Sequence, residues 1–318
     1  MRVASLLPSA TEIVCFAGAE SALVGVTHEC DYPPGVEALP KLTSSKIQSR
    51  GDSRDAPISM TSAEIDSAVR TLTDEGSIYA LDAELLERLS PDLVITQGLC
   101  EVCAVSINVV EAAVCGMDYG PEILSLNPTS LAEVLDDAAR IGEALGHGEE
   151  TRVKITSLEE RLANVEERVA HLSRPRVGCI EWLDPPFSAG HWVPEMVRLA
   201  GGEEIFAGPG EPSVELGWNE VFEGSPDVLI LMPCGFDAER TAREALVVPQ
   251  LSDLQAEGRV WVVDANSYFS RPAPRLVEGV EILARVLHPE VFTGAPETRD
   301  ARPLTLPAQG GRESHAPR

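Results

Sequence analysis

The aromatic side chains best suited to ligand binding come directly after predicted strands. In open α/β sheets, ligands bind at the carboxyl ends of the strands. Of the 15 Phe, Trp and Tyr residues, seven fall in these loops: Tyr32, Trp182, Phe187, Trp192, Phe236, Tyr268 and Phe269. Such crowding favours a cleft for a large, flat or apolar ligand. The alternative is that the rings only pack the loops.

Polar side chains near the same strand ends complete the candidate binding site. Ser9 follows the first predicted strand and Gln97 ends a later one, whereas His191 and Arg271 lie in loops of the second half. We expect these four side chains to hold the polar rim of the ligand. His191 could also approach a metal centre of the ligand as an axial donor. Trp218, at the start of a predicted helix, joins the aromatic set.

Two of the seven cysteines, Cys100 and Cys103, form a C-x-x-C motif. The motif is consistent with a redox pair, with half of a metal site or with two buried thiols. A zinc site needs about four ligands, and His28 and Cys30 follow a neighbouring predicted strand. A site for zinc or another metal at His28, Cys30, Cys100 and Cys103 is therefore one hypothesis, with buried thiols as its alternative.

The elements that position these residues alternate between strand and helix. The expected strands are 2–7, 23–26, 92–96, 122–125, 176–180, 227–231 and 259–263. Ser9 with Glu12, and Ser130 with Glu133, have the spacing of helix capping boxes. Two long helical segments, 130–145 and 149–172, interrupt the alternation. This order of elements predicts an α/β fold with parallel sheets.

Two Rossmann-like lobes follow from this pattern, joined by a long backbone helix and enclosing a ligand cleft. We expect an N-terminal α/β lobe at 1–128, a helical connector at 129–173 and a C-terminal α/β lobe at 174–290. Residues 291–318 are rich in Pro, Arg and Gly and show no periodicity, which predicts a disordered tail.

Composition excludes several classes of function. Acidic residues outnumber basic ones 51 to 25 among 318 residues, and this charge repels nucleic acid. Only three residues are lysine, which fits a salt-rich cytoplasm or a GC-rich genome. No run of 18 or more apolar residues occurs, so we expect no membrane insertion.

The sequence also carries no sign of export or of catalysis. The seven cysteines are dispersed and odd in number, unlike a disulfide scaffold. The first residues do not resemble a secretory signal, which predicts a cytoplasmic protein; a misassigned start codon would instead allow a periplasmic or extracellular one. G-x-S-x-G, H-E-x-x-H, Walker and G-x-G-x-x-G signatures are absent from the sequence, so we expect neither an enzyme nor a required cofactor.

Five segments, in order along the chain, resemble the substrate-binding proteins of class III ABC importers. They are 2–12 (RVASLLPSATE), 25–34 (GVTHECDYPP), 89–95 (LSPDLVI), 185–190 (PPFSAG) and 201–206 (GGEEIF). That family comprises cobalamin, haem and ferric-siderophore binders with two α/β lobes joined by a backbone helix. The last two segments are most similar to the cobalamin binders, and the resemblance extends from residue 2 to about residue 288.

The resemblance implies a non-enzymatic protein that holds a cobalamin-like corrinoid, or a related metal chelate, between its lobes. It also implies a partner ABC permease, which the family's lobes contact through glutamates; Glu84 and Glu203 match those positions. The His and Cys residues at 28, 30, 100 and 103 are not part of the general family pattern. A metal-binding cytoplasmic protein and an enzyme on the same scaffold therefore remain as alternatives.

Overall fold

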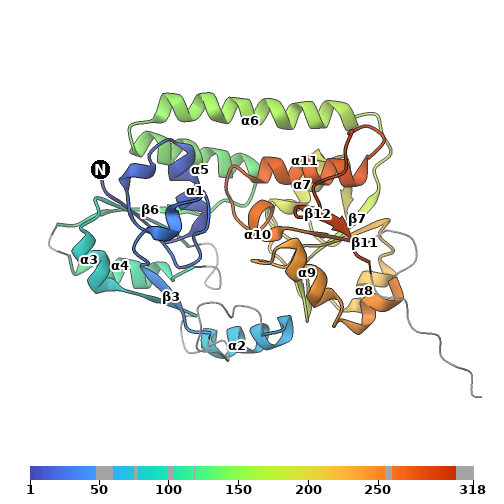
Figure 1. Ribbon diagram of the computed structural model, residues 1–318, viewed down its shortest axis with the longest axis horizontal. Helices are drawn as coiled ribbons and strands as arrows, with labels where there is room; N and C mark the ends of the chain where they lie inside the picture. Colours follow the sequence, from blue (N-terminus) through green and yellow to red (C-terminus); the bar gives the residue numbers. More distant parts are fainter. Residues whose placement is uncertain (48–59, 75–77, 99–103, 118, 255–259, 306–318) are drawn as a thin grey trace, which may run out of the picture.

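The first lobe is built on a parallel sheet of short strands. The computed structural model describes residues 1–47, 60–74, 78–98, 104–117, 119–254 and 260–305. Within them the strand order is β2-β1-β5-β6, formed by Val3–Ser5 (β1), Leu23–Gly25 (β2), Leu93–Gln97 (β5) and Glu122–Leu126 (β6). Every pairing is parallel, so crossovers must return the chain. Their helices include Pro8–Phe16 (α1), Ala83–Leu89 (α3) and Ile107–Cys115 (α4) (Figure 1).

The second lobe contains a mixed sheet with a parallel centre. Arg176–Leu183 (β7), Val228–Leu231 (β10) and Val260–Val263 (β11) form that centre. Pro186–Ser188 (β8) and Ala301–Pro303 (β12) pair antiparallel at its edges, and Glu203–Glu204 (β9) pairs parallel with β7. The helices are Val193–Leu199 (α7), Trp218–Glu223 (α8), Ala238–Ala245 (α9), Ala265–Tyr268 (α10) and Leu276–Leu287 (α11). A short 3-10 helix of this lobe occurs at Pro249–Leu254, and the first lobe has two, at Glu20–Ala22 and Val36–Ala38.

Two antiparallel helices join the lobes, Leu131–Ala144 (α5) and Gly148–Val169 (α6). The Ser130 hydroxyl accepts a hydrogen bond from the Glu133 backbone N–H, which confirms the predicted cap of α5. The two helices pack closely at Gly142, where the Cβ of any other residue would lie 2.4 Å from the Thr151 hydroxyl oxygen. With 22 residues, α6 is about 33 Å long. It packs on α5, α7 and α11 and runs along both lobes (Figure 1), so the lobes share one packed backbone.

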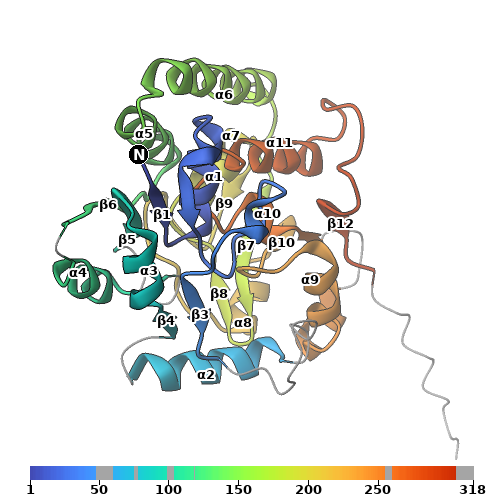
Figure 2. The same cartoon turned by 60° about the vertical axis from the view of Figure 1, so that its left-hand side comes forward.

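A small unit of the first lobe extends toward the second lobe on the side of the molecule opposite the connector helices. Thr43–Ser45 (β3) and Tyr79–Leu81 (β4) pair antiparallel, and Ser62–Asp74 (α2) lies between them in the chain. Figures 1 and 2 show α2 along the edge of the molecule farthest from α6. Because α2 contacts β7, it bridges the two lobes at that edge.

Part of the predicted disordered tail is ordered, which corrects that expectation. Strand β12 pairs with β11, with Ala301 opposite Val263. Phe292 is buried, and the Arg168 guanidinium lies over its ring at 3.9 Å. A three-residue strand reading Ala-Arg-Pro has no alternating hydrophobic pattern, so its pairing depends on the edge that β11 offers. Residues 306–318 of the predicted tail lie outside the described residues.

The expected capping box of the first helix is also wrong. α1 begins at Pro8, a residue favoured in the first helical turn, and has no side-chain cap. Ser9 is buried within the helix, and Glu12 is 3% exposed on its side chain. Glu12 instead forms ion pairs with arginines of the second lobe, which lie more than 250 residues further along the chain.

Candidate functional site

The carboxyl ends of the strands of the two lobes face each other. Glu12 lies in α1, directly after β1, and Asp31 lies in the loop after β2. Arg275 Nη2 donates to Glu12 Oε1 over 2.6 Å, and Asn266 Nδ2 donates to Asp31 Oδ2 over 3.0 Å. Both donors belong to the segment that follows β11 in the second lobe. Because ligands bind at such strand ends, the region between the lobes is the candidate site.

Glu12, Asp31, Arg271 and Arg275 form a group of ion pairs between the lobes, here called the inter-lobe cluster. The Asp31 side chain is half exposed, and the other three side chains are largely buried. Arg275 donates twice to Glu12, from Nε over 2.8 Å and from Nη2 over 2.6 Å. Arg271 donates to both Glu12 and Asp31. The side chains of Arg271 and Arg275 are only 10% and 15% exposed. Two positive and two negative groups balance, so the lobes meet through charges that neutralise each other.

Charge outweighs burial in setting the protonation of the inter-lobe cluster. Burial by itself disfavours the ionised form of Asp31, but the hydrogen bonds and charge of Arg271 hold its pKa below the usual value. Burial likewise disfavours a charged Arg271, yet Asp31 and Glu12 raise its pKa. The pair of Asp31 and Arg271 is therefore ionised at neutral pH.

A second set of contacts joins the lobes through α2. The Ser62 N–H and hydroxyl donate to Glu244 Oε2 over 3.1 and 3.2 Å. Arg70 donates to Glu215 Oε2 over 2.8 Å, and both side chains are more than half exposed. These contacts lie at the edge of the molecule farthest from α6 (Figure 2). The candidate site is thus bordered by buried ion pairs on one side and by exposed ones on the other.

Trp182, Phe236 and Arg240 form a stack at the strand ends of the second lobe. The Trp182 and Phe236 rings lie 5.5 Å apart, and the Arg240 guanidinium lies 3.7 Å from the Phe236 centroid. Trp182 Nε1 and Arg240 Nε are both buried and have no hydrogen-bond partner among the described residues. An unsatisfied buried donor costs about 1–3 kcal/mol. The stack therefore holds two unsatisfied donors beside the facing strand ends.

Tyr32 and Tyr268 flank Arg275 of the inter-lobe cluster. The Arg275 guanidinium lies 4.0 Å from the Tyr32 centroid and 5.9 Å from the Tyr268 centroid. Tyr32 belongs to the first lobe and is 41% exposed, whereas Tyr268 donates its hydroxyl to Asp300. The structure thus brings these two predicted site residues together from opposite lobes.

Three other predicted ligand contacts, Trp192, Trp218 and Phe269, lie in the core of the second lobe. Trp192 Nε1 donates to the Phe269 carbonyl over 2.8 Å, and Trp218 Nε1 donates to the Leu183 carbonyl over 3.2 Å. Phe269 is 2% exposed. A residue's place in a loop after a strand does not indicate whether its ring points into the core or toward the cleft. For this reason the sequence analysis placed these three residues with the cleft aromatics.

The remaining predicted contacts occupy different depths. Ser9 is buried in α1, and Gln97 is buried at the end of β5, opposite Leu126. Phe187 is half-buried in β8 and pairs with Trp182 across the ladder. His191 is half-buried with a positive φ of 54°, and burial lowers its pKa. Of these four, Phe187 adjoins the stack at Trp182.

Only half of the hypothetical metal site lies in the described residues. Cys30 Sγ lies 3.1 Å from the Thr11 hydroxyl and 3.2 Å from the Thr27 hydroxyl. His28 Nδ1 lies 2.8 Å from the Thr43 hydroxyl. Cys100 and Cys103 lie outside the described residues. Within the described ranges, no group of three or more His, Cys, Asp or Glu side chains could hold a metal ion.

The two glutamates expected to contact a permease are exposed on opposite lobes. Glu84, in the first turn of α3, has a side chain 93% exposed. Glu203 is exposed in β9, whereas the neighbouring Glu204 points inward and accepts backbone N–H groups of Cys179, Ile205 and Phe206. Burial raises the pKa of Glu204 to about 7. The exposure of Glu84 and Glu203 is compatible with docking, which stays a prediction.

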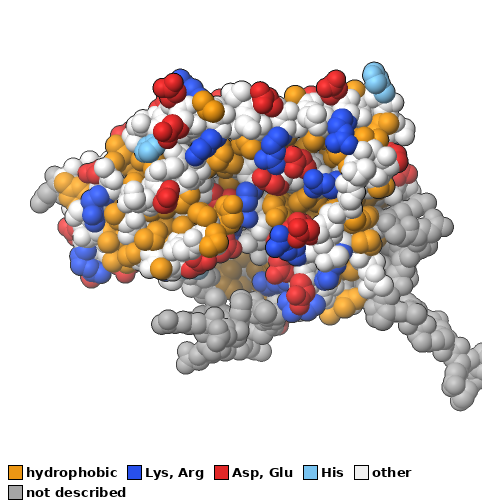
Figure 3. Space-filling view, turned by 45° about the horizontal axis from the view of Figure 1, so that its top comes forward, with side chains coloured by type: hydrophobic (Ala, Val, Ile, Leu, Met, Phe, Trp, Pro, Cys, Tyr) orange, Lys and Arg blue, Asp and Glu red, His pale blue; other side chains and the backbone are white. Residues whose placement is uncertain are grey.

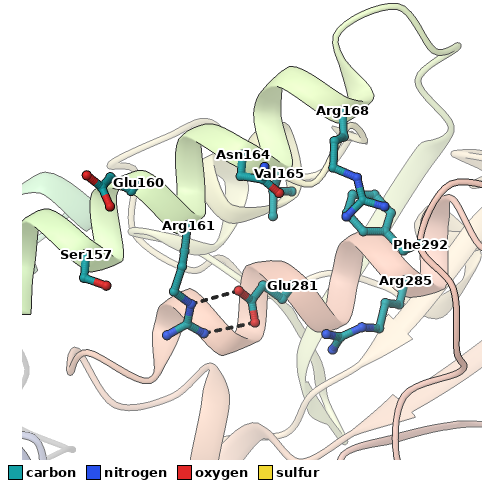
Figure 4. A pocket seen from close by; sticks show the side chains of 9 residues that line it. All are labelled: Ser157, Glu160, Arg161, Asn164, Val165, Arg168, Glu281, Arg285 and Phe292. Atoms are coloured by element: carbon teal, nitrogen blue, oxygen red, sulfur yellow. Dashed lines mark hydrogen bonds and ion pairs between the residues drawn. The ribbon is translucent and has the colours of Figure 1, made fainter.

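A groove of about 280 Å³ lies elsewhere among the described residues, between α6 and α11. Its lining side chains largely pair with one another: Arg161 with Glu281, and Arg168 with the Phe292 ring (Figure 4). A second hollow of about 650 Å³ lies at the turn between α5 and α6. Figure 3 shows this side of the molecule, where acidic and basic side chains are interspersed with hydrophobic ones. The second hollow lies on the connector and the first lies between the connector and α11, so both are away from the facing strand ends.

The chain folds into two α/β lobes whose sheets have parallel strands at their centres. A packed helical connector joins the lobes, and their strand ends face each other. This arrangement is that of a ligand-binding protein of the two-lobe type. The chain belongs to the periplasmic binding protein family, whose model matches residues 3–250. Within the described residues, no helix combines the length and apolar character needed to cross a membrane.

Known relatives agree with this assignment. The vitamin B12-binding protein of Photorhabdus laumondii is 22% identical over 298 residues, covering 91% of this chain and 88% of the relative. The periplasmic vitamin B12 binding protein of Vibrio cholerae superposes with a TM-score of 0.63 at 21% identity, covering 90% and 96% of the two chains. A periplasmic heme binding protein from Pseudomonas aeruginosa gives 0.69 at 18% identity, covering 93% and 95%. The two structures show the shared fold.

Sequence reasoning missed Glu12, Asp31, Arg275 and Arg240 as site residues. Two signals were available in the sequence. The first is that Arg271 and Arg275 are four residues apart next to predicted strand-end aromatics. The second is Glu12, whose neighbours Ala10, Ile13 and Val14 are apolar residues of the same helix. A carboxylate among buried apolar residues is expected to pair with a basic side chain. Which residues would supply that partner could not be found from spacing.

Proposed function

We propose that this chain binds a cobalamin-type corrinoid, or a related tetrapyrrole, between its two lobes and releases it unchanged. The observation that carries the proposal is the presence of exposed and half-buried aromatic residues in both lobes at the facing strand ends. Tyr32 comes from the first lobe, and Trp182 and Phe187 come from the second. Flat macrocycles gain affinity by stacking and burial against such rings. The B12- and heme-binding relatives support the same ligand class.

A binding role without turnover fits the chemistry of the inter-lobe region. Its carboxylates, Glu12 and Asp31, are engaged by arginines, and Asp31 is held ionised by Arg271. Groups fixed in ion pairs set the position of the lobes and are poorly placed to transfer protons to or from a ligand. The inter-lobe cluster is therefore proposed to be structural.

A permease partner is part of the proposal, with Glu84 and Glu203 as its contacts. Both glutamates are exposed, and they lie on opposite lobes. A transporter with arginines at matching positions would bind both glutamates only when the lobes are the right distance apart. A cytoplasmic location stays a separate prediction, which cell fractionation with an antibody tests.

Titration with three macrocycles tests the proposed function. Cyanocobalamin, dicyanocobinamide and haem are each added to the purified protein while tryptophan fluorescence is followed. We expect saturable quenching by at least one of them, with the absorption spectrum of the bound macrocycle constant over hours. Absence of saturable quenching by all three contradicts the proposal. Elemental analysis of the purified protein adds a check, because stoichiometric zinc would favour the metal-site hypothesis.

Tyr32 and Tyr119 make a matched pair of variants for the same titration. They are 41% and 45% exposed, but Tyr32 lies beside the facing strand ends and Tyr119 precedes β6, at the opposite edge of its sheet. We expect Tyr32→Ala to weaken binding by roughly three- to tenfold, the value of one aromatic stack, and Tyr119→Ala to leave it unchanged. Equal effects of the two variants would place the ligand elsewhere.

A further inference from the structure

The stack of Trp182, Phe236 and Arg240 lies between the two sets of inter-lobe contacts. The Asn266 N–H donates to the Phe236 carbonyl, and the Asn266 side chain donates to Asp31 of the first lobe. On the other side, Glu244 accepts from Ser62 of α2. Arg240 and Glu244 are four residues apart on α9 and so share the helix face that meets the first lobe. The stack therefore borders the region where the ligand is proposed to bind.

Arg240 is held there by its stacking on Phe236, without an ion pair in the described residues. Two carboxylates are near enough to act on its charge, Glu244 and Asp237, but each is engaged elsewhere. Glu244 accepts from Ser62, and Asp237 caps α9 by accepting the Arg240 backbone N–H over 2.7 Å. The Nε atom of Arg240 is buried with no acceptor among the described residues.

The Arg240 side chain is half-buried, and its Nε atom is the buried part. A guanidinium stays protonated, and an anionic oxygen forms charge-assisted hydrogen bonds with it. The indole N–H of Trp182, on the same Phe236 ring, is a neutral donor that is equally unsatisfied.

We propose that Arg240, assisted by Trp182, is the specificity-determining residue of the site and that the preferred ligand carries a carboxylate substituent on its macrocycle. This inference rests on the proposed function and narrows its ligand class. Peripheral carboxylates occur on corrin rings with free propionate side chains and on haem. A macrocycle whose side chains are all amides would leave the Arg240 charge without its counter-ion.

Two corrinoids that differ at one side chain test the inference. Dicyanocobyric acid has a free propionate where dicyanocobinamide has an amide, and cyanide occupies both axial positions in each. Both are titrated into the full chain by calorimetry, for the wild type and for Arg240→Gln. The control is Arg243→Gln, which removes a half-exposed arginine of the same helix that pairs with Glu239.

We expect the wild type to bind dicyanocobyric acid at least roughly tenfold more tightly than dicyanocobinamide. Arg240→Gln should bring this ratio close to one, Arg243→Gln should preserve it, and Arg240→Lys should restore part of it. Trp182→Phe keeps a ring in the stack but removes the indole donor, and should weaken the binding of dicyanocobyric acid severalfold.

The outcomes separate the inference from the function on which it rests. Binding of both corrinoids by the wild type with equal affinity, or a ratio unchanged in Arg240→Gln, overturns the inference and leaves corrinoid binding intact. Haem, with two propionates, is titrated in parallel: tight haem binding that Arg240→Gln weakens supports the inference with haem as the carboxylate source. Binding of none of the three overturns both proposals. Thermal unfolding of each variant verifies that it is folded.

Discussion

The two sets of contacts that join the lobes differ in burial far more than in geometry. In the inter-lobe cluster, Arg275 meets Glu12 at 2.6 Å with both side chains nearly buried. On the α2 side, Arg70 meets Glu215 at 2.8 Å with both more than half exposed. Exposed ion pairs contribute little because water solvates the separated charges, whereas a buried charge that loses its partner is strongly destabilising. The inter-lobe cluster is therefore expected to hold the lobes together, and the α2 contacts are expected to open readily.

Removing Glu12 gives the largest expected effect. Glu12→Ala leaves Arg271 without one of its partners and Arg275 without its carboxylate, with both side chains largely buried. We expect a loss of about 3–5 kcal/mol in the free energy of unfolding, measured with urea. Glu20→Ala, an exposed acid just after the same helix, should leave the stability unchanged. A Glu12→Ala protein as stable as the wild type would show that the cluster does not hold the lobes.

Acid should weaken the inter-lobe cluster through Asp31. The pKa of Asp31 is lower in the folded protein than in the unfolded chain, so its ion pair stabilises the fold above the unfolded pKa of 3.8. That stability is lost as the pH falls below this value toward the lower folded pKa. We expect Asp31→Asn to reduce the slope of unfolding free energy against pH below about pH 4. An identical slope in wild type and variant would contradict the assignment.

The α2 contact should show a smaller, salt-dependent effect. A double-mutant cycle of Arg70→Ala and Glu215→Ala is expected to give a weak coupling at low ionic strength and none in 1 M salt, because exposed charges are screened. Limited proteolysis within 62–74 should become faster in Arg70→Ala while the overall stability stays the same. A coupling that persists in high salt would place this contact in the same class as the inter-lobe cluster.

Replacing Glu84 or Glu203 should affect neither the inter-lobe cluster nor the α2 contacts. Glu84 is 93% exposed, and within the described part of the chain its side chain pairs with Arg88 of its own helix, at 4.0 Å. We expect Glu84→Ala and Glu203→Ala to leave unfolding and ligand titration unchanged and to weaken only capture by a detergent-solubilised permease. A change in ligand affinity would mean that these positions contribute to the site and not to docking.

The sequence was informative wherever the signal is local. Ser130 and Glu133 predicted the start of α5, and the run of buried apolar residues predicted β5 within a residue or two. Loop aromatics indicated the strand-end region, and Tyr32, Trp182 and Phe187 do lie there. The same rule did not indicate the depth of Trp192 and Phe269, which are buried in the core of the second lobe, where Trp192 donates to the Phe269 carbonyl.

What the sequence determined by itself is the alternation of strands and helices, the helical connector and the family, because periodicity, caps and short motifs all act within a few residues. The tertiary structure alone decided the partners of Glu12, the pairing of β12 with β11 and the stacking of Arg240 on Phe236. Glu12 and Arg275 are 263 residues apart, and only packing of both lobes on α6 brings them within 2.6 Å. Burial then gives those contacts their strength, and burial is a property of the folded chain.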